Sequence, residues 1–276
     1  MLRDITIGQY YSADSVLHRL DPRTKLVGTL IYLVSLFLFA TPLVYVPATL
    51  FLMIVIFLSK VPFGYMVKGL KPVLFLLLFT VLMNMIFVKG EVIATIWKIE
   101  ITKEGLKQSL LMGARLILLI LGSNVMTLTT TPTRLTNAME SVMRPLKLIR
   151  VPVHEIAMMM SIALRFIPIL LDETDKIMKA QMARGADFES GNLVKKAKSL
   201  IPVLVPLFIS AFRRANDLAM AMEARCYHGG EGRTQMKPLR YTGRDFAAYM
   251  ILLLYLAGVI VTGKYSTEVL DWIGVR

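Results

Sequence analysis

Two segments, VHEIAMMMSIALRFIPILLDETDKIMKAQMARG (residues 153–185) and IPVLVPLFISAFRRANDLAMAMEARC (residues 201–226), decide how the rest of the chain is interpreted. In both, apolar or small residues recur at steps of three and four, the spacing of one face of an α-helix. Each ends on an arginine that follows alanine and precedes a small residue. The sequence therefore predicts two long helices with matching ends, here called the arginine tips: Ala183-Arg184-Gly185 and Ala224-Arg225-Cys226.

The composition places these helices in a membrane protein. Of the 276 residues, 55% are hydrophobic, which is too apolar for an ordinary soluble domain. The net charge of +13 fits cytoplasmic loops of a membrane protein better than a nucleic-acid surface. A single cysteine excludes an internal disulfide. We therefore expect an all-α integral membrane protein.

Long apolar stretches predict about five transmembrane helices. They are residues 26–40, 43–59, 72–88, 110–128 and 245–262. The loops between them alternate between basic and near-neutral, which places the N-terminus in the cytoplasm and the C-terminus outside by the positive-inside rule.

The same pattern divides the chain into five parts. We expect a cytoplasmic N-terminal segment (1–25), transmembrane helices 1–4 (26–128), a cytoplasmic or interfacial module of long crossed helices (129–244), transmembrane helix 5 (245–263) and an external tail (264–276).

The module at 129–244 holds eighteen Lys and Arg against ten Asp and Glu. It should begin with a basic helix from Thr131 to about Leu148. Whether residues 153–171 enter the membrane stays open, because Arg165 near their middle costs about 2.5–3.5 kcal/mol on insertion. We favour helices that lie partly in the interface and partly in the cytoplasm.

Catalytic and metal-binding patterns are missing from the sequence. It contains no phosphate-binding loop of the Gly-x-x-x-x-Gly-Lys-Ser/Thr type. The histidines His18, His154 and His228 are scattered, and no metal-ligand spacing joins them. The acidic cluster Asp172, Glu173 and Asp175 is more typical of a solvated face, or of partners for Lys176 and Lys179, than of catalytic carboxylates. Asn84 in the third span is expected to make an interhelical hydrogen bond. We expect no cofactor, metal or catalytic site.

Arg184 and Arg225 admit two interpretations. A basic residue at a helix C-terminus stabilises the helix dipole by about 0.3–1 kcal/mol, which explains either one alone. Two such arginines between small neighbours favour docking, because a planar guanidinium with five donors can enter a narrow cleft of a partner. Met158, Met159 and Met160 are candidates for a second interface, since methionine side chains re-pack readily.

Three features of the sequence give a family resemblance. They are the paired tips, the arrangement of spans and the N-terminal stretch Leu17-His18-Arg19-Leu20-Asp21-Pro22-Arg23-Thr24-Lys25-Leu26. Over essentially its whole length the chain resembles the transmembrane T component (EcfT, CbiQ-like) of energy-coupling factor (ECF) ABC transporters of the bacterial plasma membrane.

The resemblance implies a scaffold rather than an enzyme. In that family the T component links two cytoplasmic ABC-type ATPase subunits to a small membrane S component that captures a vitamin or metal ion. The arginine motifs end crossed coupling helices and insert into grooves on the ATPases. Carried over, these roles fall on the two tips. The second departs from Ala-Arg-Gly at Cys226, where a left-handed turn is less favourable than at glycine.

Other classes of function stay open. A conventional permease would line its own substrate path, for which Asn84 and Arg115 are the main candidates. A membrane enzyme would need a polar constellation at the interface, for which the sequence offers His18 with Asp14 and Asp21. Nucleic-acid binding is disfavoured, because the basic helices lack interleaved aromatic residues.

Overall fold

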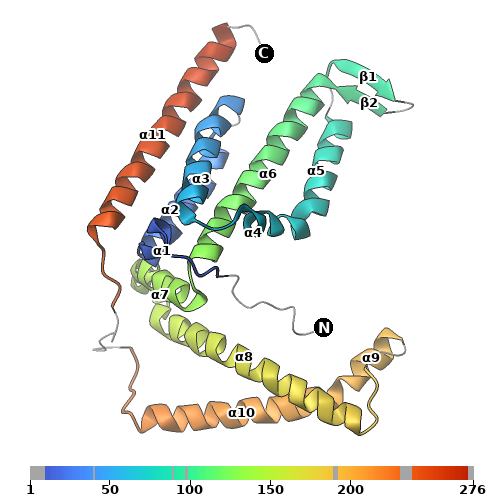
Figure 1. Ribbon diagram of the computed structural model, residues 1–276, viewed down its shortest axis with the longest axis vertical. Helices are drawn as coiled ribbons and strands as arrows, with labels where there is room; N and C mark the ends of the chain where they lie inside the picture. The colour runs from blue at the N-terminus through green and yellow to red at the C-terminus, as the bar shows by residue number, and fades with distance from the viewer. Residues whose placement is uncertain are drawn as a thin grey trace. The chain divides into compact units, whose positions relative to one another are not determined.

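The computed structural model describes residues 10–39, 41–88, 90–96, 99–188, 192–230 and 238–272. Residues 1–9 of the expected N-terminal segment and 273–276 of the expected tail lie outside the described residues. The chain forms two compact units (Figure 1). The bundle unit lies within residues 8–138 and 239–276, and the crossed-helix unit lies within residues 139–238.

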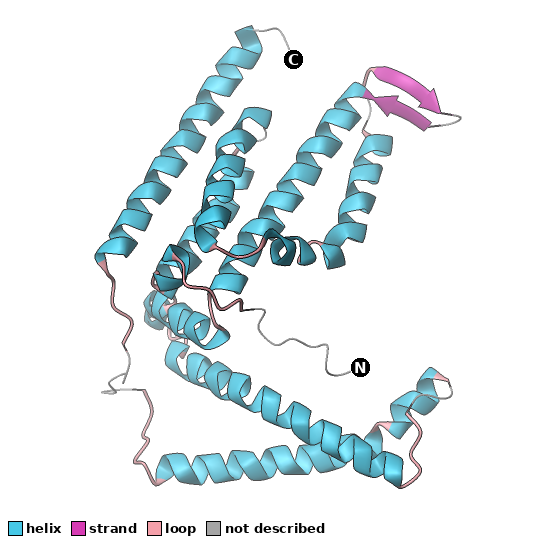
Figure 2. Cartoon of the chain, viewed as in Figure 1, coloured by secondary structure: helices cyan, strands magenta, loops and turns pink. Residues whose placement is uncertain are grey.

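Helices make up nearly all of the bundle unit (Figure 2). They are α1 (Val16–Arg19), α2 (Pro22–Leu38), α3 (Tyr45–Ser59), α4 (Phe63–Lys68), α5 (Leu74–Phe87), α6 (Lys103–Thr129) and α11 (Gly243–Trp272), with short 3₁₀ turns at Pro42–Val44 and Lys71–Val73. The all-α membrane class predicted from the sequence is confirmed.

One small sheet departs from that class. Strands β1 (Val92–Ile96) and β2 (Ile99–Thr102) pair antiparallel where the sequence led us to expect a plain loop. The segment is rich in valine, isoleucine and threonine, which favour strands. Thr102 ends β2 and caps α6, because its hydroxyl accepts a hydrogen bond from the Gly105 amide (3.1 Å) and donates one to the Val88 carbonyl (2.6 Å).

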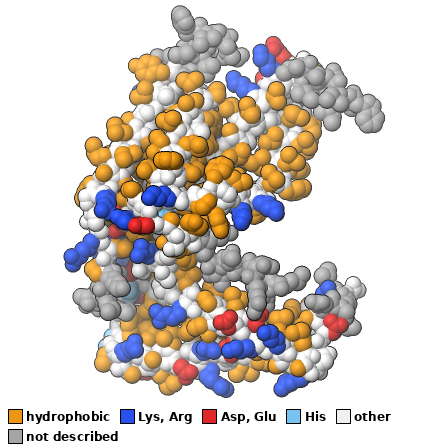
Figure 3. Space-filling model, viewed as in Figure 1, with side chains coloured by type: hydrophobic (Ala, Val, Ile, Leu, Met, Phe, Trp, Pro, Cys, Tyr) orange, Lys and Arg blue, Asp and Glu red, His pale blue; other side chains and the backbone are white. Residues whose placement is uncertain are grey.

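Among the described residues, five helical stretches are long and apolar enough to cross a membrane. They are Pro42–Ser59, Phe63–Phe87, Lys103–Thr129, Val153–Ala183 and Gly243–Tyr265. Four coincide with predicted spans. The fifth is in the crossed-helix unit, while the predicted first span forms the 17-residue α2. On the face shown in Figure 3, hydrophobic side chains cover most of the bundle unit and charged ones gather toward its ends.

Helix α6 packs against α2, α3 and α5, and α11 packs against α2 and α3. Close approach requires Gly122 on α6, since a Cβ there would lie 2.6 Å from the ring of Tyr32. Phe51 stacks on Tyr255 with ring centroids 4.3 Å apart, and the Tyr255 hydroxyl lies 2.6 Å from that of Ser35. Aromatic packing therefore joins α2, α3 and α11 beside α6.

A buried carboxylate ties the start of α2 to the start of α11. Asp245 is 1% exposed. Its oxygens accept hydrogen bonds from the Asp21 amide (2.8 Å), the Thr24 hydroxyl (3.2 Å), and the amide (2.8 Å) and hydroxyl (2.7 Å) of Thr242. Asp21 is itself the N-cap of α2, with Pro22 in the first turn, as the sequence predicts. One side chain thus satisfies donors at two helix starts.

Replacing Asp245 should destabilise the bundle unit. The change Asp245→Ala leaves four buried or partly buried donors without their acceptor, and we expect a loss of about 3–5 kcal/mol. Thermal unfolding of the detergent-purified protein would measure it. The exposed Asp217→Asn is the control and should change stability by less than about 0.5 kcal/mol. Equal melting temperatures for wild type and Asp245→Ala would contradict this role.

The crossed-helix unit contains α8 (Val153–Ala183), α9 (Leu193–Ser199) and α10 (Ile201–Glu223). Helix α7 (Pro132–Val142) runs across the boundary between the units. The expected continuous basic helix to Leu148 is wrong: α7 stops at Val142 and a 3₁₀ turn occupies Arg144–Ile149. Pro145 explains the break, because proline disfavours helical geometry at the preceding residue and lacks an amide donor.

Candidate functional site

The two long helices of the crossed-helix unit cross each other, and a carboxylate holds the crossing (Figure 1). Glu173 on α8 accepts hydrogen bonds from the Ser210 hydroxyl (2.6 Å) and the Arg214 guanidinium (2.7 Å) on α10. The Glu173 side chain is 23% exposed and that of Arg214 is 39% exposed. Glu173 of the acidic cluster thus pairs across helices, and its hydrogen bonds go to Ser210 and Arg214 rather than to the expected Lys176 and Lys179.

The crossing is antiparallel, so the two tips lie at opposite ends of the pair. Near the end of α8, the side-chain amide nitrogen of Gln181 lies 3.5 Å from the backbone carbonyl of Pro202 at the start of α10. Arg225 comes 23 residues after Pro202, and a helix rises about 1.5 Å per residue. The two arginines are therefore separated by roughly 35 Å along α10.

The first tip ends in a Schellman turn. The Gly185 amide donates to the Met182 carbonyl (2.9 Å), and the Ala186 amide donates to the Gln181 carbonyl (3.0 Å). Gly185 has φ +87°, the left-handed conformation that glycine adopts without a steric penalty. Arg184 is the last residue before the reversal, so its side chain leaves the helix at its very end.

The second tip repeats this turn with cysteine in place of glycine. The Cys226 amide donates to the Glu223 carbonyl (2.9 Å), and the Tyr227 amide donates to the Met222 carbonyl (3.1 Å). Cys226 has φ +55°, although the sequence made a left-handed turn there less favourable. Such a conformation costs an L-residue about 1–2 kcal/mol. The two arginines consequently occupy equivalent positions of equivalent turns.

Both arginines are exposed. Among the residues that the structure describes, no ion pair or hydrogen bond holds either guanidinium. By contrast, Arg214 at the crossing is paired. The side-chain donors of the two tips are thus available to a partner, and the small neighbours Ala183 and Ala224 leave them uncrowded.

The three methionines lie near the opposite end of α8 from its tip. Met159 and Met160 are 57% and 41% exposed, and Met158 is partly buried. On α10 an apolar stripe is exposed as well, with Leu204, Phe208 and Phe212 each more than half exposed. The unit therefore presents apolar surface along its helices and basic groups at its ends.

Several alternative site residues have local structural roles. Burial lowers the pKa of His18, whose ring nitrogens face the Ser15 hydroxyl (2.7 Å) and the Tyr11 carbonyl (2.9 Å). Asp14 pairs with Arg19, and the hydrogen bond from that guanidinium lowers the pKa of the carboxyl group. The side chains of His18, Asp14 and Asp21 each bond to separate groups and do not form one constellation.

The candidates for a substrate path are also engaged. The Asn84 amide donates to the Thr80 carbonyl of its own helix (2.9 Å), so the expected interhelical hydrogen bond is wrong. Arg115 points into the bundle, where it donates to the Tyr45 hydroxyl (2.8 Å) and lies over the Phe37 ring. In the crossed-helix unit, His154 pairs with Glu140 (2.8 Å).

Sequence reasoning missed the residues that hold these elements together. Ser210 and Arg214 gave no signal as partners of Glu173, because they lie 37 and 41 residues further along the chain. The charge pattern of α10 could have indicated that Arg214 forms an ion pair, but not that its partner is Glu173. The sequence indicates Asp245 only as the start of a span. It does not indicate the role of Asp245 as an acceptor, because two of the three residues that donate to it, Asp21 and Thr24, lie more than 200 positions earlier in the chain.

The apolar helices of membrane-crossing length define a multi-pass membrane protein, which also carries a unit of crossed helices with two arginine tips. The sequence pattern of the family described as cobalt transport protein (CbiQ) matches residues 13–236, more than half of the chain.

Curated relatives give the same assignment. A protein of Ruminiclostridium cellulolyticum is 54% identical over 261 residues, which cover 95% of this chain and 98% of the relative. One of Bacillus subtilis is 46% identical over 258 residues, covering 93% and 97%. Both are named energy-coupling factor transporter transmembrane protein EcfT. The chain belongs to this family, and the resemblance inferred from its sequence is confirmed.

Substitutions at the two left-handed positions should have opposite effects. Cys226→Gly relieves backbone strain and should raise stability by about 1 kcal/mol, while Gly185→Ala introduces it and should lower stability by about 1 kcal/mol. A Cβ at Gly185 meets nothing within 4 Å, so the effect is one of backbone alone. Thermal unfolding measures both effects. Cys226→Ala is the control and should leave stability unchanged, because alanine has the same left-handed strain as cysteine. A lower stability of Cys226→Gly than of wild type would contradict backbone strain at Cys226.

The crossing contact is testable by charge reversal. Glu173→Arg places two cations together and should loosen the crossing, at a cost of about 1 kcal/mol, whereas Glu173→Arg with Arg214→Glu should restore it. Spin labels at the native Cys226 and at Met182→Cys would report the distance between tips by electron spin resonance. We expect one narrow distribution in the wild type, broadening in the single variant and narrowing in the double. An unchanged width throughout would show that this contact does not hold the crossing.

Proposed function

We propose that the chain is the energy-coupling transmembrane scaffold of an ECF-type importer of a vitamin or metal ion. It would link two cytoplasmic ABC-type ATPase subunits to a small membrane S component that binds the substrate. The single observation that carries this proposal is the pair of exposed arginines in equivalent Schellman turns at opposite ends of a crossed helix pair.

The geometry suits a clamp on two copies of a similar subunit. Equivalent turns present the two guanidinium groups alike, and a roughly 35 Å separation gives each its own partner. A guanidinium that enters a groove forms several directed hydrogen bonds and loses water, so each tip anchors one ATPase. In this proposal the chain holds no nucleotide and catalyses no reaction itself.

Coupling then follows from the crossing. When ATP binding closes the two ATPases, the grooves carry the tips toward each other. Because Glu173 holds α8 and α10 together at the crossing, movement at the ends changes the crossing angle. The apolar faces of α10 and the exposed Met159 and Met160 re-pack against the S component, which tilts and releases its substrate inward.

The proposed orientation has the N-terminus and the crossed-helix unit in the cytoplasm and the C-terminus outside. Loop charges support it. Helix α8 is apolar enough to cross a membrane, but Arg165 near its middle is exposed, which favours a place at the interface.

Charge reversal of the tips should separate the ATPases from the chain. In Arg184→Glu/Arg225→Glu the docking donors become acids, and retention of ATPases in a pull-down from membranes should fall at least tenfold, since a buried charge contact costs about 2–5 kcal/mol to remove. The matched control is Arg213→Glu, an exposed arginine within α10. It should retain both ATPases and the S component.

The pull-down also addresses the alternatives. A wild-type chain that purifies alone, and still transports substrate after reconstitution, would contradict the coupling proposal and favour a permease. Full substrate uptake by the double variant would likewise show that the tips are ordinary helix ends.

A further inference from the structure

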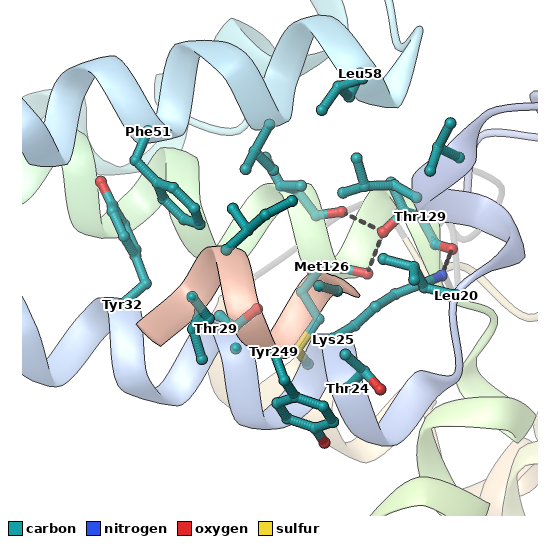
Figure 4. Close-up of a pocket in the computed structure, with 18 of the residues that line it drawn as sticks. Leu20, Thr24, Lys25, Thr29, Tyr32, Phe51, Leu58, Met126, Thr129 and Tyr249 are labelled. Atoms are coloured by element: carbon teal, nitrogen blue, oxygen red, sulfur yellow. Dashed lines mark hydrogen bonds between the residues drawn. The ribbon is translucent and has the colours of Figure 1, made fainter. Parts of the chain in front are cut away.

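A cavity of about 310 Å³ lies inside the bundle unit, among α2, α3, α6 and α11 (Figure 4). It is open on one side, and its walls are almost entirely apolar. Gly28 on α2, Leu58 on α3, Met126 on α6 and Leu252 on α11 each contribute to the lining. The tips, which carry the proposed function, belong to the other unit.

The cavity runs along the helices. Tyr32 and Phe51 stand at one end, and Lys25 and Thr129 stand at the other (Figure 4). Lys25 and Tyr32 are seven residues apart on α2, which corresponds to about 10 Å. An apolar space of this length matches a stretch of extended hydrocarbon chain.

One end of the cavity holds a buried cation. Lys25 is 9% exposed, and its ammonium donates a hydrogen bond to the Thr129 carbonyl (2.8 Å). Within the described parts of the chain no carboxylate forms an ion pair with it. The nearby Asp245 is already occupied by four other donors. A buried ammonium with one neutral acceptor has donors left for an anion.

A second basic residue also lines the cavity. Arg244, in the first turn of α11, lines the cavity and is exposed. In the described structure no hydrogen bond or ion pair engages its guanidinium. Two basic residues, from the first turns of α2 and α11, thus line the cavity.

We propose that this cavity binds one anionic phospholipid of the surrounding bilayer. One acyl chain would occupy the apolar space up to Tyr32 and Phe51, and the phosphate would lie at Lys25 and Arg244. A zwitterionic lipid offers the same chain but adds a positive group beside two cations, so the site prefers a net negative head group. Bound there, the lipid bridges the starts of α2 and α11.

Fluorescence quenching by brominated phospholipids in nanodiscs tests the proposal. The reporter is Leu58→Trp, placed in a chain with Trp97→Phe and Trp272→Phe. At equal fractions, brominated phosphatidylglycerol should quench it more than brominated phosphatidylcholine, with a preference of about fivefold for each basic residue engaged. Leu78→Trp on α5, which is 64% exposed, is the matched control and should show no preference.

Three variants separate the head-group contact from the cavity. Arg244→Gln alters an exposed side chain and should lower the preference about fivefold without unfolding the protein; Lys25→Gln should lower it further. Gly28→Leu should reduce quenching by both lipids, because a Cβ at Gly28 first meets Leu252 at 3.6 Å and the larger side chain extends into the cavity.

Equal quenching of the Leu58→Trp reporter by both lipids would overturn the proposal. An unchanged preference in both Arg244→Gln and Lys25→Gln would do so as well. Quenching by a brominated free fatty acid, with none by either phospholipid, would assign the cavity to a different amphiphile and also reject it. ATPase retention in the pull-down depends on the tips and not on this cavity. The coupling proposal and the lipid-binding proposal can therefore be contradicted independently of each other.

Discussion

The contact of Glu173 with Ser210 and Arg214 is the constraint on which the proposed function depends. It joins two helices whose ends carry the arginine tips, and its hydrogen bonds of 2.6 and 2.7 Å fix which part of α8 meets which part of α10. Without a held crossing, movement of one tip would slide a helix rather than turn it. The partial exposure of the pair keeps the contact modest in free energy, which suits a joint that has to change angle.

The tips show how the backbone places a functional side chain. An arginine that precedes a left-handed residue is the last group on its helix, so its guanidinium extends beyond the helix end. At Gly185 this geometry costs no strain, whereas at Cys226 it costs about 1–2 kcal/mol. The turn is formed in both cases because two backbone hydrogen bonds close it. Strain kept at an exposed position is consistent with a requirement of binding rather than of folding.

In the bundle unit, one buried acid and one buried base organise the same end. Asp245 satisfies donors at the starts of α2 and α11, and Lys25 reaches from α2 to the end of α6. Asp21, Thr24 and Lys25 come from a single stretch of the N-terminal motif, so this motif builds the joint among three helices. The acid is saturated by its donors and the base is not, which is why an anionic ligand is inferred at the base.

The sequence by itself determined the helical membrane class, four of the membrane-crossing stretches, the Asp21-Pro22 helix start and the positions of both tips. These follow from local signals: apolar length, turn residues and the periodicity of one helix face. The strands at 92–96 and 99–102 are too short to leave a clear periodic signal, and α7 ends before Leu148 because Pro145 interrupts the helical pattern. Only the tertiary structure decided that Glu173 meets Arg214, that Asp245 joins two helix starts and that Lys25 lines an apolar cavity. Each of these depends on residues far apart in the chain, which no local spacing pattern brings together.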